Sequence, residues 1–412
     1  KWSKRLKFLA NSFLWFIVVI TLSISLIEAT FCQDLKLLEL SILVIASLVC
    51  FVNYKKITLD RVDINIIFFL VSLNLIFLFI EAKGLIYFKP TFILLLSILL
   101  SKLILPYMTI KEYMKKINLI YVIILIGLII EYILMVSIGE SLIKDTFECN
   151  GEVTGVRGYI AQLNITKYIL PFHVTGLNSI MLGTQTADQL SIIISIWFFS
   201  KLNLTGKKIY KAAAYLGVIL LFLSPSITSL MIFIIVVFIM YFKSGIKRWN
   251  EPVKGFGRFY VFIAIAFTGL FLFIQVLTSK YYSLDYVYQT YVLEQINGFG
   301  FFSINEILFG LTVERELELF GVGEIAFLAH LVKYGLIGFV LFYGSILFYA
   351  LRALIKSKKS ILLNANIFIL FLMVIGNFHY AVMLGNGVME LFILHFVFLI
   401  YEGSPQRKII LE

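Results

Sequence analysis

The chain has 412 residues, of which 61% are hydrophobic and only 14% are charged. A soluble domain has about 25% charged and about 45–50% apolar residues, so this composition excludes an ordinary soluble protein. The chain has only six prolines and no low-complexity tract, which excludes a disordered protein. A polytopic membrane protein remains. The net charge of +11 then indicates basic loops at an anionic membrane face, and no nucleic-acid partner is expected.

Twelve stretches are apolar enough for membrane spans, each of which needs about 20 such residues, although several are short. They lie near 8–27, 37–53, 64–81, 90–107, 117–138, 178–200, 209–223, 226–242, 259–278, 324–351, 361–377 and 387–401. We expect an all-α fold with about twelve transmembrane helices, forming a single membrane domain over 1–412. Ser224 and Pro225 predict a tight hairpin between the seventh and eighth spans. The first span has no cleavage site after it and is interpreted as a signal anchor.

The basic residues predict how the chain is oriented. With the N-terminus inside, 25 of the 35 Lys and Arg residues fall in cytoplasmic segments and eight fall outside. This asymmetry follows the positive-inside rule and puts both termini in the cytoplasm. Two long external (periplasmic) loops result, 139–177 and 279–323, and we expect both to contain short helices. We find no internal repeat, which counts against a transporter built from symmetric halves.

Five ionisable residues fall clearly within predicted spans, where charges are costly and mark functional sites by default. They are Lys102, Glu131, Asp188, Lys333 and Glu390. Most of them indicate a polar cavity open to the outside. The alternative is pairing between helices, for example of Glu131 with Lys333, which only holds the bundle together. His330 comes three residues before Lys333, so these two share a helix face.

Motifs for nucleotides and metals are missing from the sequence. There is no P-loop, no HExxH and no CxxC pair, and the four His residues are not spaced as a metal site. We therefore expect no cofactor and no metal. Cys32 and Cys149 both fall in external segments, where they are either two thiols or one disulfide.

Only two arginines fall in the external loops, and arginine binds phosphate or carboxylate through two hydrogen bonds. Arg157 is flanked by glycines in Gly155–Tyr159 and is the better candidate for an anion-binding residue. Arg315 lies in the acidic run ERELELFGVGE, where pairing with its neighbours on a solvated amphipathic helix explains it equally well.

Three segments resemble the bacterial O-antigen polymerases of the Wzy type. The stretch PFHVTGLNSIMLGTQTADQLSI (171–192) resembles their entry from loop to helix, and LSPSITSLMIFIIVVFIM their Ser-rich turn. The third segment, ILFGLTVERELELFGVGEIAFLAHLVKYGLIGFVLFY, has Phe309-Gly310, Glu324 and Tyr334-Gly335-Leu336-Ile337-Gly338 at the family's positions. His173 stands where many members have Arg, which shifts phosphate binding onto Arg157.

The resemblance implies a GT-C-like, metal-independent glycosyltransferase in the bacterial inner membrane. Such an enzyme joins oligosaccharide repeat units carried on undecaprenyl diphosphate, with its active site facing the periplasm. Its partners would be these lipid-linked donors and acceptors, membrane lipid and a chain-length regulator protein.

The proposed chemistry needs cations to neutralise the diphosphate leaving group and a base for the acceptor hydroxyl. We place Arg157, His173, Arg315 and Lys333 near the diphosphate. Glu324 or His330 would be the catalytic base, and His379 would complete the cavity from the segment 377–386.

Other functions fit parts of this pattern. An O-antigen ligase shares the layout but transfers finished polymer to a lipid A core. A transporter or flippase for lipid-linked sugars would use the intramembrane charges, although it predicts pseudo-symmetric halves. A purely structural membrane partner leaves the external Arg and His residues unexplained.

Overall fold

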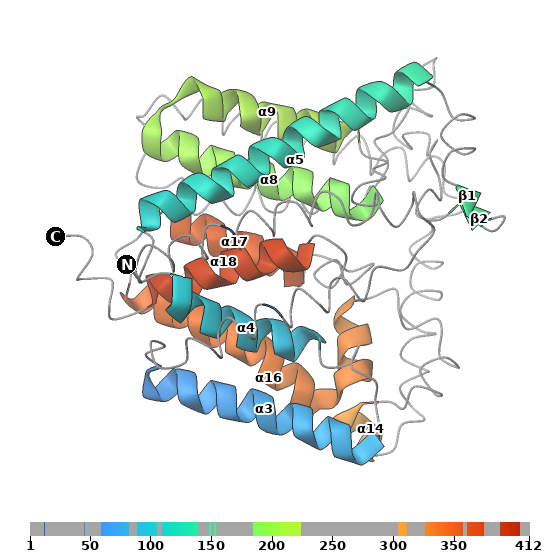
Figure 1. Cartoon of the computed structure of the whole chain (residues 1–412), viewed down its shortest axis with the longest axis vertical. Helices are drawn as coiled ribbons and strands as arrows, with labels where there is room; N and C mark the ends of the chain where they lie inside the picture. The colour runs from blue at the N-terminus through green and yellow to red at the C-terminus, as the bar shows by residue number, and fades with distance from the viewer. Residues whose placement is uncertain are drawn as a thin grey trace, which may run out of the picture. The chain divides into compact units, whose positions relative to one another are not determined.

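The structure is a computed structural model, and it describes a little under half of the chain. The described residues are 12, 45, 59–81, 89–104, 109–138, 148–149, 152–153, 184–223, 304–310, 326–356, 361–374 and 388–403. The helices are α3 (Arg61–Glu81), α4 (Lys89–Ile104), α5 (Ile110–Ile138), α8 (Thr184–Thr205), α9 (Lys208–Phe222), α14 (Ile304–Phe309), α16 (Ala326–Lys356), α17 (Ile361–Val374) and α18 (Val388–Glu402) (Figure 1).

The described part is helical, as expected, apart from one short β pairing. β1 (Glu148–Cys149) pairs antiparallel with β2 (Glu152–Val153) inside the first predicted long loop. The described residues of that loop thus form a β pairing where we expected a short helix. The second predicted long loop does contain a short helix, α14. Cys32 lies outside the described residues, so the choice between two thiols and a disulfide with Cys149 is not tested.

Among the described residues, two helices are long and apolar enough to cross a membrane, over Ile110–Ile133 and Tyr334–Ile355. Two shorter apolar helices cover Thr91–Lys102 and Leu391–Glu402. Eight of the twelve predicted spans coincide with described helices. The other four, near 8–27, 37–53, 226–242 and 259–278, lie outside the described residues except for the single positions 12 and 45, as does the predicted hairpin at Ser224 and Pro225.

Side chains before the first turn explain where α3 and α5 begin. The Asp60 carboxylate accepts hydrogen bonds from the backbone N–H groups of Val62 and Asp63, while the Asp63 carboxylate accepts one from the Asp60 N–H. Thr109 and Glu112 form the same reciprocal cap at α5. Such capping boxes satisfy N–H groups that have no partner inside the helix. They place the start of α5 earlier than the apolar pattern predicts.

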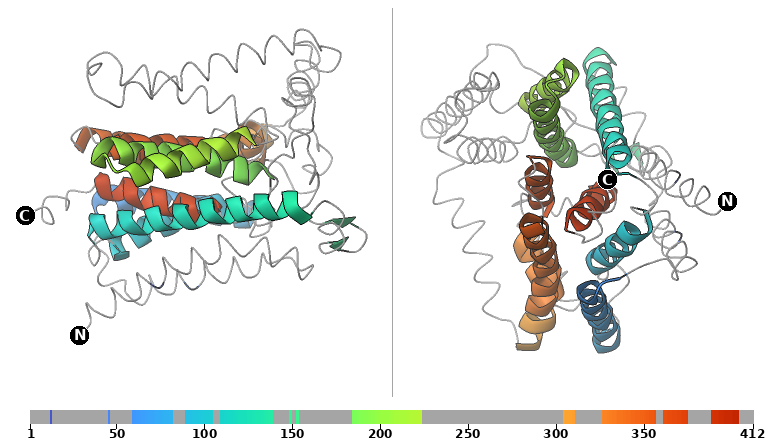
Figure 2. Two further views of the ribbon diagram at one scale, coloured as in Figure 1. Left: turned by 90° about the horizontal axis from the view of Figure 1, so that it is seen from above. Right: turned by 90° about the vertical axis from the view of Figure 1, so that its left-hand side faces the viewer.

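The chain packs as two compact units, residues 1–124 with 297–412 and residues 125–296. In the first unit, α18 packs against α4, α16 and α17 (Figures 1 and 2). Aromatic rings fill this contact, because Phe396 stacks on Phe392 and meets the edge of Tyr349, both at 5.5 Å between centroids. All three side chains are buried, so α18 is the central helix of this unit.

In the second unit, α8 and α9 form a closely packed hairpin around Gly206 (Figure 2). A Cβ on Gly217 of α9 would lie 2.5 Å from Ser195 Oγ and 3.1 Å from Ser191 O on α8. Both serine hydroxyls donate to the carbonyl four residues earlier. Small residues thus let the two backbones approach, as they do between membrane helices, and the serine hydroxyls remain hydrogen-bonded.

Candidate functional site

Most of the predicted site residues lie outside the described part of the chain. These are Arg157, His173, Arg315, Glu324 and His379. His330 and Lys333 lie on α16, and the structure describes their backbone only. Their predicted roles therefore stay predictions.

α16 bends sharply just after these two residues. Gly335 has φ 65° and ψ 177° inside an otherwise helical segment. Figure 1 shows the short start of α16 turning away from its long remainder, beside α14. A positive φ is costly for any residue with a Cβ, so glycine suits this position. His330 and Lys333 therefore lie on a short helical segment that is set apart from the long membrane-type helix.

Gly335 also touches the backbone that ends α14. A Cβ at this position would lie 2.3 Å from Leu308 O and 2.5 Å from Gly310 N, which is far inside van der Waals contact. Gly310 itself has φ 88°, and its N–H donates to Glu306 O at 2.8 Å. Two motifs of the third segment that carries the family resemblance, Phe309-Gly310 and Tyr334-Gly335, thus meet in space. We call this contact the glycine junction.

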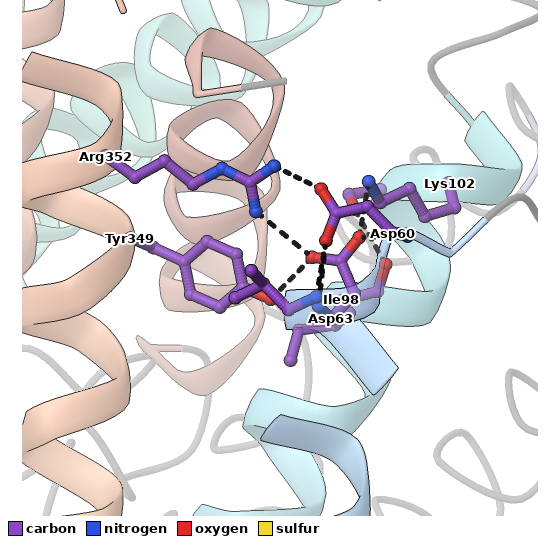
Figure 3. Close-up of polar contacts among 8 residues, drawn as sticks. Asp60, Asp63, Ile98, Lys102, Tyr349 and Arg352 are labelled. Atoms are coloured by element: carbon purple, nitrogen blue, oxygen red, sulfur yellow. Dashed lines mark hydrogen bonds and ion pairs between the residues drawn. The ribbon is translucent and has the colours of Figure 1, made fainter. Parts of the chain in front are cut away.

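A cluster of charges ties three helices together at the other end of the same unit (Figure 3). Lys102 Nζ of α4 lies 2.7 Å from the Asp63 carboxylate of α3. Tyr349 of α16 donates to Asp63 at 2.9 Å, and Arg352 forms an ion pair with Asp60. Arg352 also lies 3.7 Å from Asp63. We call these five side chains the ionic cluster.

The ionic cluster corrects the prediction for Lys102. Lys102 is one of the five charges for which we weighed a polar cavity against pairing between helices, and its amine is paired with Asp63, whose side chain is fully buried. For this residue the alternative interpretation, pairing between helices, is right. Glu131 is buried on α5, whereas the side chains of Asp188, Lys333 and Glu390 lie outside the described part. The alternative that Glu131 pairs with Lys333 is therefore not tested.

The partners of Asp60 explain its electrostatics. Burial alone would raise the pKa of Asp60, but the hydrogen bond from Arg352, the Asp63 backbone N–H and the charges of Arg352 and Lys102 lower it to about 2. Asp60 thus stays ionised at neutral pH, and it forms an ion pair with Arg352.

Four helix ends meet around the ionic cluster. The start of α3 and the end of α4 join through Asp63 and Lys102, and the end of α16 joins them through Arg352. Gly403, which closes α18, lies against Ala353 and Arg352 of α16. Helix α3 therefore runs opposite to α4, α16 and α18, as expected if α3 is an odd-numbered span and the other three are even-numbered spans.

A second buried polar group links α5, α17 and α18. Asn366 donates its amide N–H to the His395 carbonyl at 3.0 Å, so its Oδ1 faces His395 Nδ1 at 2.6 Å. Nδ1 must then carry the proton, and Nε2 accepts the hydrogen bond from the Tyr121 hydroxyl. Tyr113 donates to the Leu394 carbonyl at 2.7 Å. This group is internally satisfied, which indicates helix packing rather than chemistry.

The sequence reasoning missed Asp60, Asp63 and Arg352. Asp63 falls one residue before the predicted third span, and Arg352 was assigned to topology alone. The spacing Asp60-x-x-Asp63 before an apolar run was the available signal, because it is a capping pattern. Among the described residues, no group of three or more His, Cys, Asp or Glu side chains could hold a metal ion.

Comparisons with protein-family models, with curated proteins and with solved structures find no match to this chain. The resemblance to the polymerases therefore rests on the residues that carry it. Of those residues, the structure brings together Phe309-Gly310, at the end of α14, and Tyr334-Gly335 of α16.

Proposed function

We propose that the chain is an inner-membrane glycosyltransferase that polymerises oligosaccharide repeat units carried on undecaprenyl diphosphate. In this proposal about twelve helices span the membrane, both termini are cytoplasmic, and the reaction takes place at the periplasmic face. It produces O-antigen or a related surface polysaccharide.

The glycine junction is the observation that carries the proposal. It fixes the second predicted external loop, through Leu308 and Gly310, to the turn in α16 directly after His330 and Lys333. A cationic residue and a candidate base then lie on a short segment that a loop holds in place. Active sites on membrane scaffolds need such loops, because positioned side chains act only from a fixed backbone.

The grouping of helix ends supports the orientation. The ends that carry Asp60, Lys102 and Arg352 lie together, and these are the ends that the positive-inside rule assigns to the cytoplasm. The glycine junction is at the opposite end of α16, which the same rule assigns to the periplasm. The proposed site and the basic loops thus lie at different faces.

The reaction follows from the residue types. The base, Glu324 or His330, takes the proton of the acceptor sugar's hydroxyl as that oxygen bonds to the donor's anomeric carbon. The bond from this carbon to the diphosphate oxygen breaks, and undecaprenyl diphosphate leaves. Arg157, His173, Arg315 and Lys333 stabilise the negative charge on the leaving group, while His379 contributes to the cavity wall. The reaction uses no oxidant, metal or nucleotide.

The structure favours an enzyme over a flippase. A flippase must open its substrate path to both faces in turn. The ionic cluster joins α3, α4 and α16 at one end through buried ion pairs, and breaking such pairs costs several kcal/mol, on the order of 3–5. A bundle fixed at one face suits a site that opens only to the other.

The proposal is tested by reconstituting the purified full-length chain in liposomes with the lipid-linked repeat unit of the producing organism and nothing else. We expect a ladder of longer oligosaccharides on undecaprenyl diphosphate. Arg157→Ala should abolish the ladder, whereas Lys36→Ala, in another predicted external loop, should not. An intact substrate and a correctly inserted protein that together give no ladder would refute polymerase activity. Transfer of finished polymer to an added lipid A core would instead identify a ligase.

A further inference from the structure

The turn between α8 and α9 carries a concentration of positive charge. Lys201, Lys207, Lys208 and Lys211 fall within eleven residues. The sequence has no Asp or Glu from 189 to 250, so this stretch of the chain carries positive charge only. We call residues 201–211 the basic turn.

Aromatic rings hold part of the basic turn in place. The buried Lys201 has its amine 5.6 Å from the centre of the Trp197 ring, and the exposed Lys211 has its amine 5.8 Å from that of Tyr215. Phe198 stacks on Tyr210 across the hairpin at 5.9 Å between centroids. Cation–π contacts and stacking of this kind reduce the freedom of long side chains, so the amines are partly pre-arranged for a ligand.

Exposed apolar side chains flank the same lysines. Leu204 and Ile209 are 46% and 68% exposed at the turn, and Ile219 is 52% exposed further along α9. Lys207 and Lys208 are exposed between them. A surface that combines basic and apolar side chains is typical of the boundary between lipid headgroups and acyl chains. An acidic protein or a nucleic acid would match the lysines but leave Leu204 and Ile209 in water.

We propose that the basic turn binds the phosphate headgroups of anionic phospholipids at the cytoplasmic face of the membrane. Lys207, Lys208 and Lys211 contact the headgroup phosphates, while Leu204 and Ile209 contact the acyl chains beneath. The contact anchors the α8–α9 hairpin, and it is independent of glycosyl transfer.

Lys201 strengthens the same assignment. Burial lowers the pKa of Lys201, because the low-polarity surroundings disfavour its charge. A phosphate beside the turn would favour the charged form of this amine. The hairpin thus has exposed lysines that attract an anion. It also has the buried Lys201, whose charged form a bound anion would stabilise.

The test counts lipids that stay bound to the purified full-length chain. The protein is titrated in neutral detergent with phosphatidylglycerol or with phosphatidylcholine, and native mass spectrometry reports the bound lipids. We expect phosphatidylglycerol to bind at least about tenfold more tightly, because each lysine near an anionic surface adds to the attraction. The triple variant K207Q/K208Q/K211Q should lose this preference, and the variant with three arginines should keep it.

A matched control removes the same charge elsewhere. Lys111, Lys115 and Lys116 start α5, beside the acidic Glu112, and the triple variant K111Q/K115Q/K116Q should keep the preference. Equal losses in both triple variants would overturn the proposal, because binding would then follow net charge alone. Equal binding of both lipids to the unmodified chain would also overturn it, as would displacement of the lipid by inorganic phosphate. Labelling of a cysteine placed in the turn checks that each variant keeps its orientation.

Discussion

The two ends of the first unit are held together in opposite ways. At one end, the ionic cluster joins α3, α4 and α16 through charged side chains that reach across from each helix. At the other end, the glycine junction joins α14 and α16 through backbone alone, because Gly335 has no side chain to separate them. The first contact depends on charge and the second on the absence of a Cβ.

The difference shows what a buried charge in a membrane helix can mean. Lys102 and Asp63 form an ion pair with each other, so their charges stabilise the bundle and are not available to bind a substrate. The glycine junction requires no polar side chain, so the residues around it can be used for chemistry. Each end can be broken separately, and the free energies that are lost should tell the two kinds of contact apart.

Replacing Lys102 with Met should have the largest effect. The Asp63 carboxylate would stay buried with Arg352, Tyr349 and the Asp60 backbone N–H as partners but without the Lys102 amine, and breaking a buried pair costs about 3 kcal/mol or more. Unfolding in mixed micelles with increasing SDS measures this loss. The double variant Lys102→Met/Asp63→Asn should recover at least about 1 kcal/mol, since no unpaired charge remains. Additive losses would contradict direct pairing.

Replacing Gly335 with Ala tests the glycine junction. The new Cβ would clash with Leu308 O, and the positive φ adds about 1–2 kcal/mol, so we expect a loss of at least about 2 kcal/mol. Gly344→Ala is the matched control, because nothing lies within 4 Å of its Cβ position on the same helix. That variant should be unchanged or up to about 1 kcal/mol more stable. Similar behaviour of both variants would show that the turn at Gly335 is not required.

Acidification should weaken only the ionic end. The pKa of Asp60 is about 2 in the folded chain and 3.8 in its unperturbed state. A lowered pKa contributes stability that is complete above pH 4 and is lost as the pH falls towards 2, by about 1–2 kcal/mol. Circular dichroism across this range, with and without Asp60→Asn, measures the difference. Asp60→Asn should flatten the dependence of stability on pH, and Arg352→Met should flatten it too. If the slope is unchanged in both variants, other carboxylates cause the loss of stability.

Tyr349→Phe should have the smallest effect. It removes one hydrogen bond to Asp63 and leaves the ring against Phe396, so we expect a loss of about 1 kcal/mol. The loss should vanish when Asp63 is already replaced by Leu, which the same SDS titration can measure. A loss that persists in that background would mean that the hydroxyl acts elsewhere.

The helices themselves could be predicted from the sequence because long apolar runs have few other stable forms in lipid. The predicted span near 361–377 and the helix α17 (Ile361–Val374) begin at the same residue, for example. The bend at Gly335 was not predicted. An apolar run continues through that position, so hydropathy predicts an unbroken helix. Glycine is necessary there because the backbone at the end of α14 lies close by, and hydropathy carries no information about such a contact.

The ionic cluster could not be predicted for a different reason. Asp60 and Arg352 are 292 positions apart in the sequence. The pattern of apolar residues in one helix does not show which other helix packs beside it. The sequence did place both residues on the same predicted side of the membrane. Arg157 and the other loop residues of the proposed site stay as predictions, because their chemistry depends on positions that apolar patterns do not determine.

The carboxylate of Asp60 has a further consequence, because it serves two structures at once. It accepts the N–H groups of Val62 and Asp63 at the start of α3, and it pairs with Arg352 of α16. Opening the first turn of α3 and releasing the end of α16 should therefore be one cooperative event. Hydrogen–deuterium exchange at the Val62 and Asp63 amides would then report on a side chain that lies almost three hundred residues away.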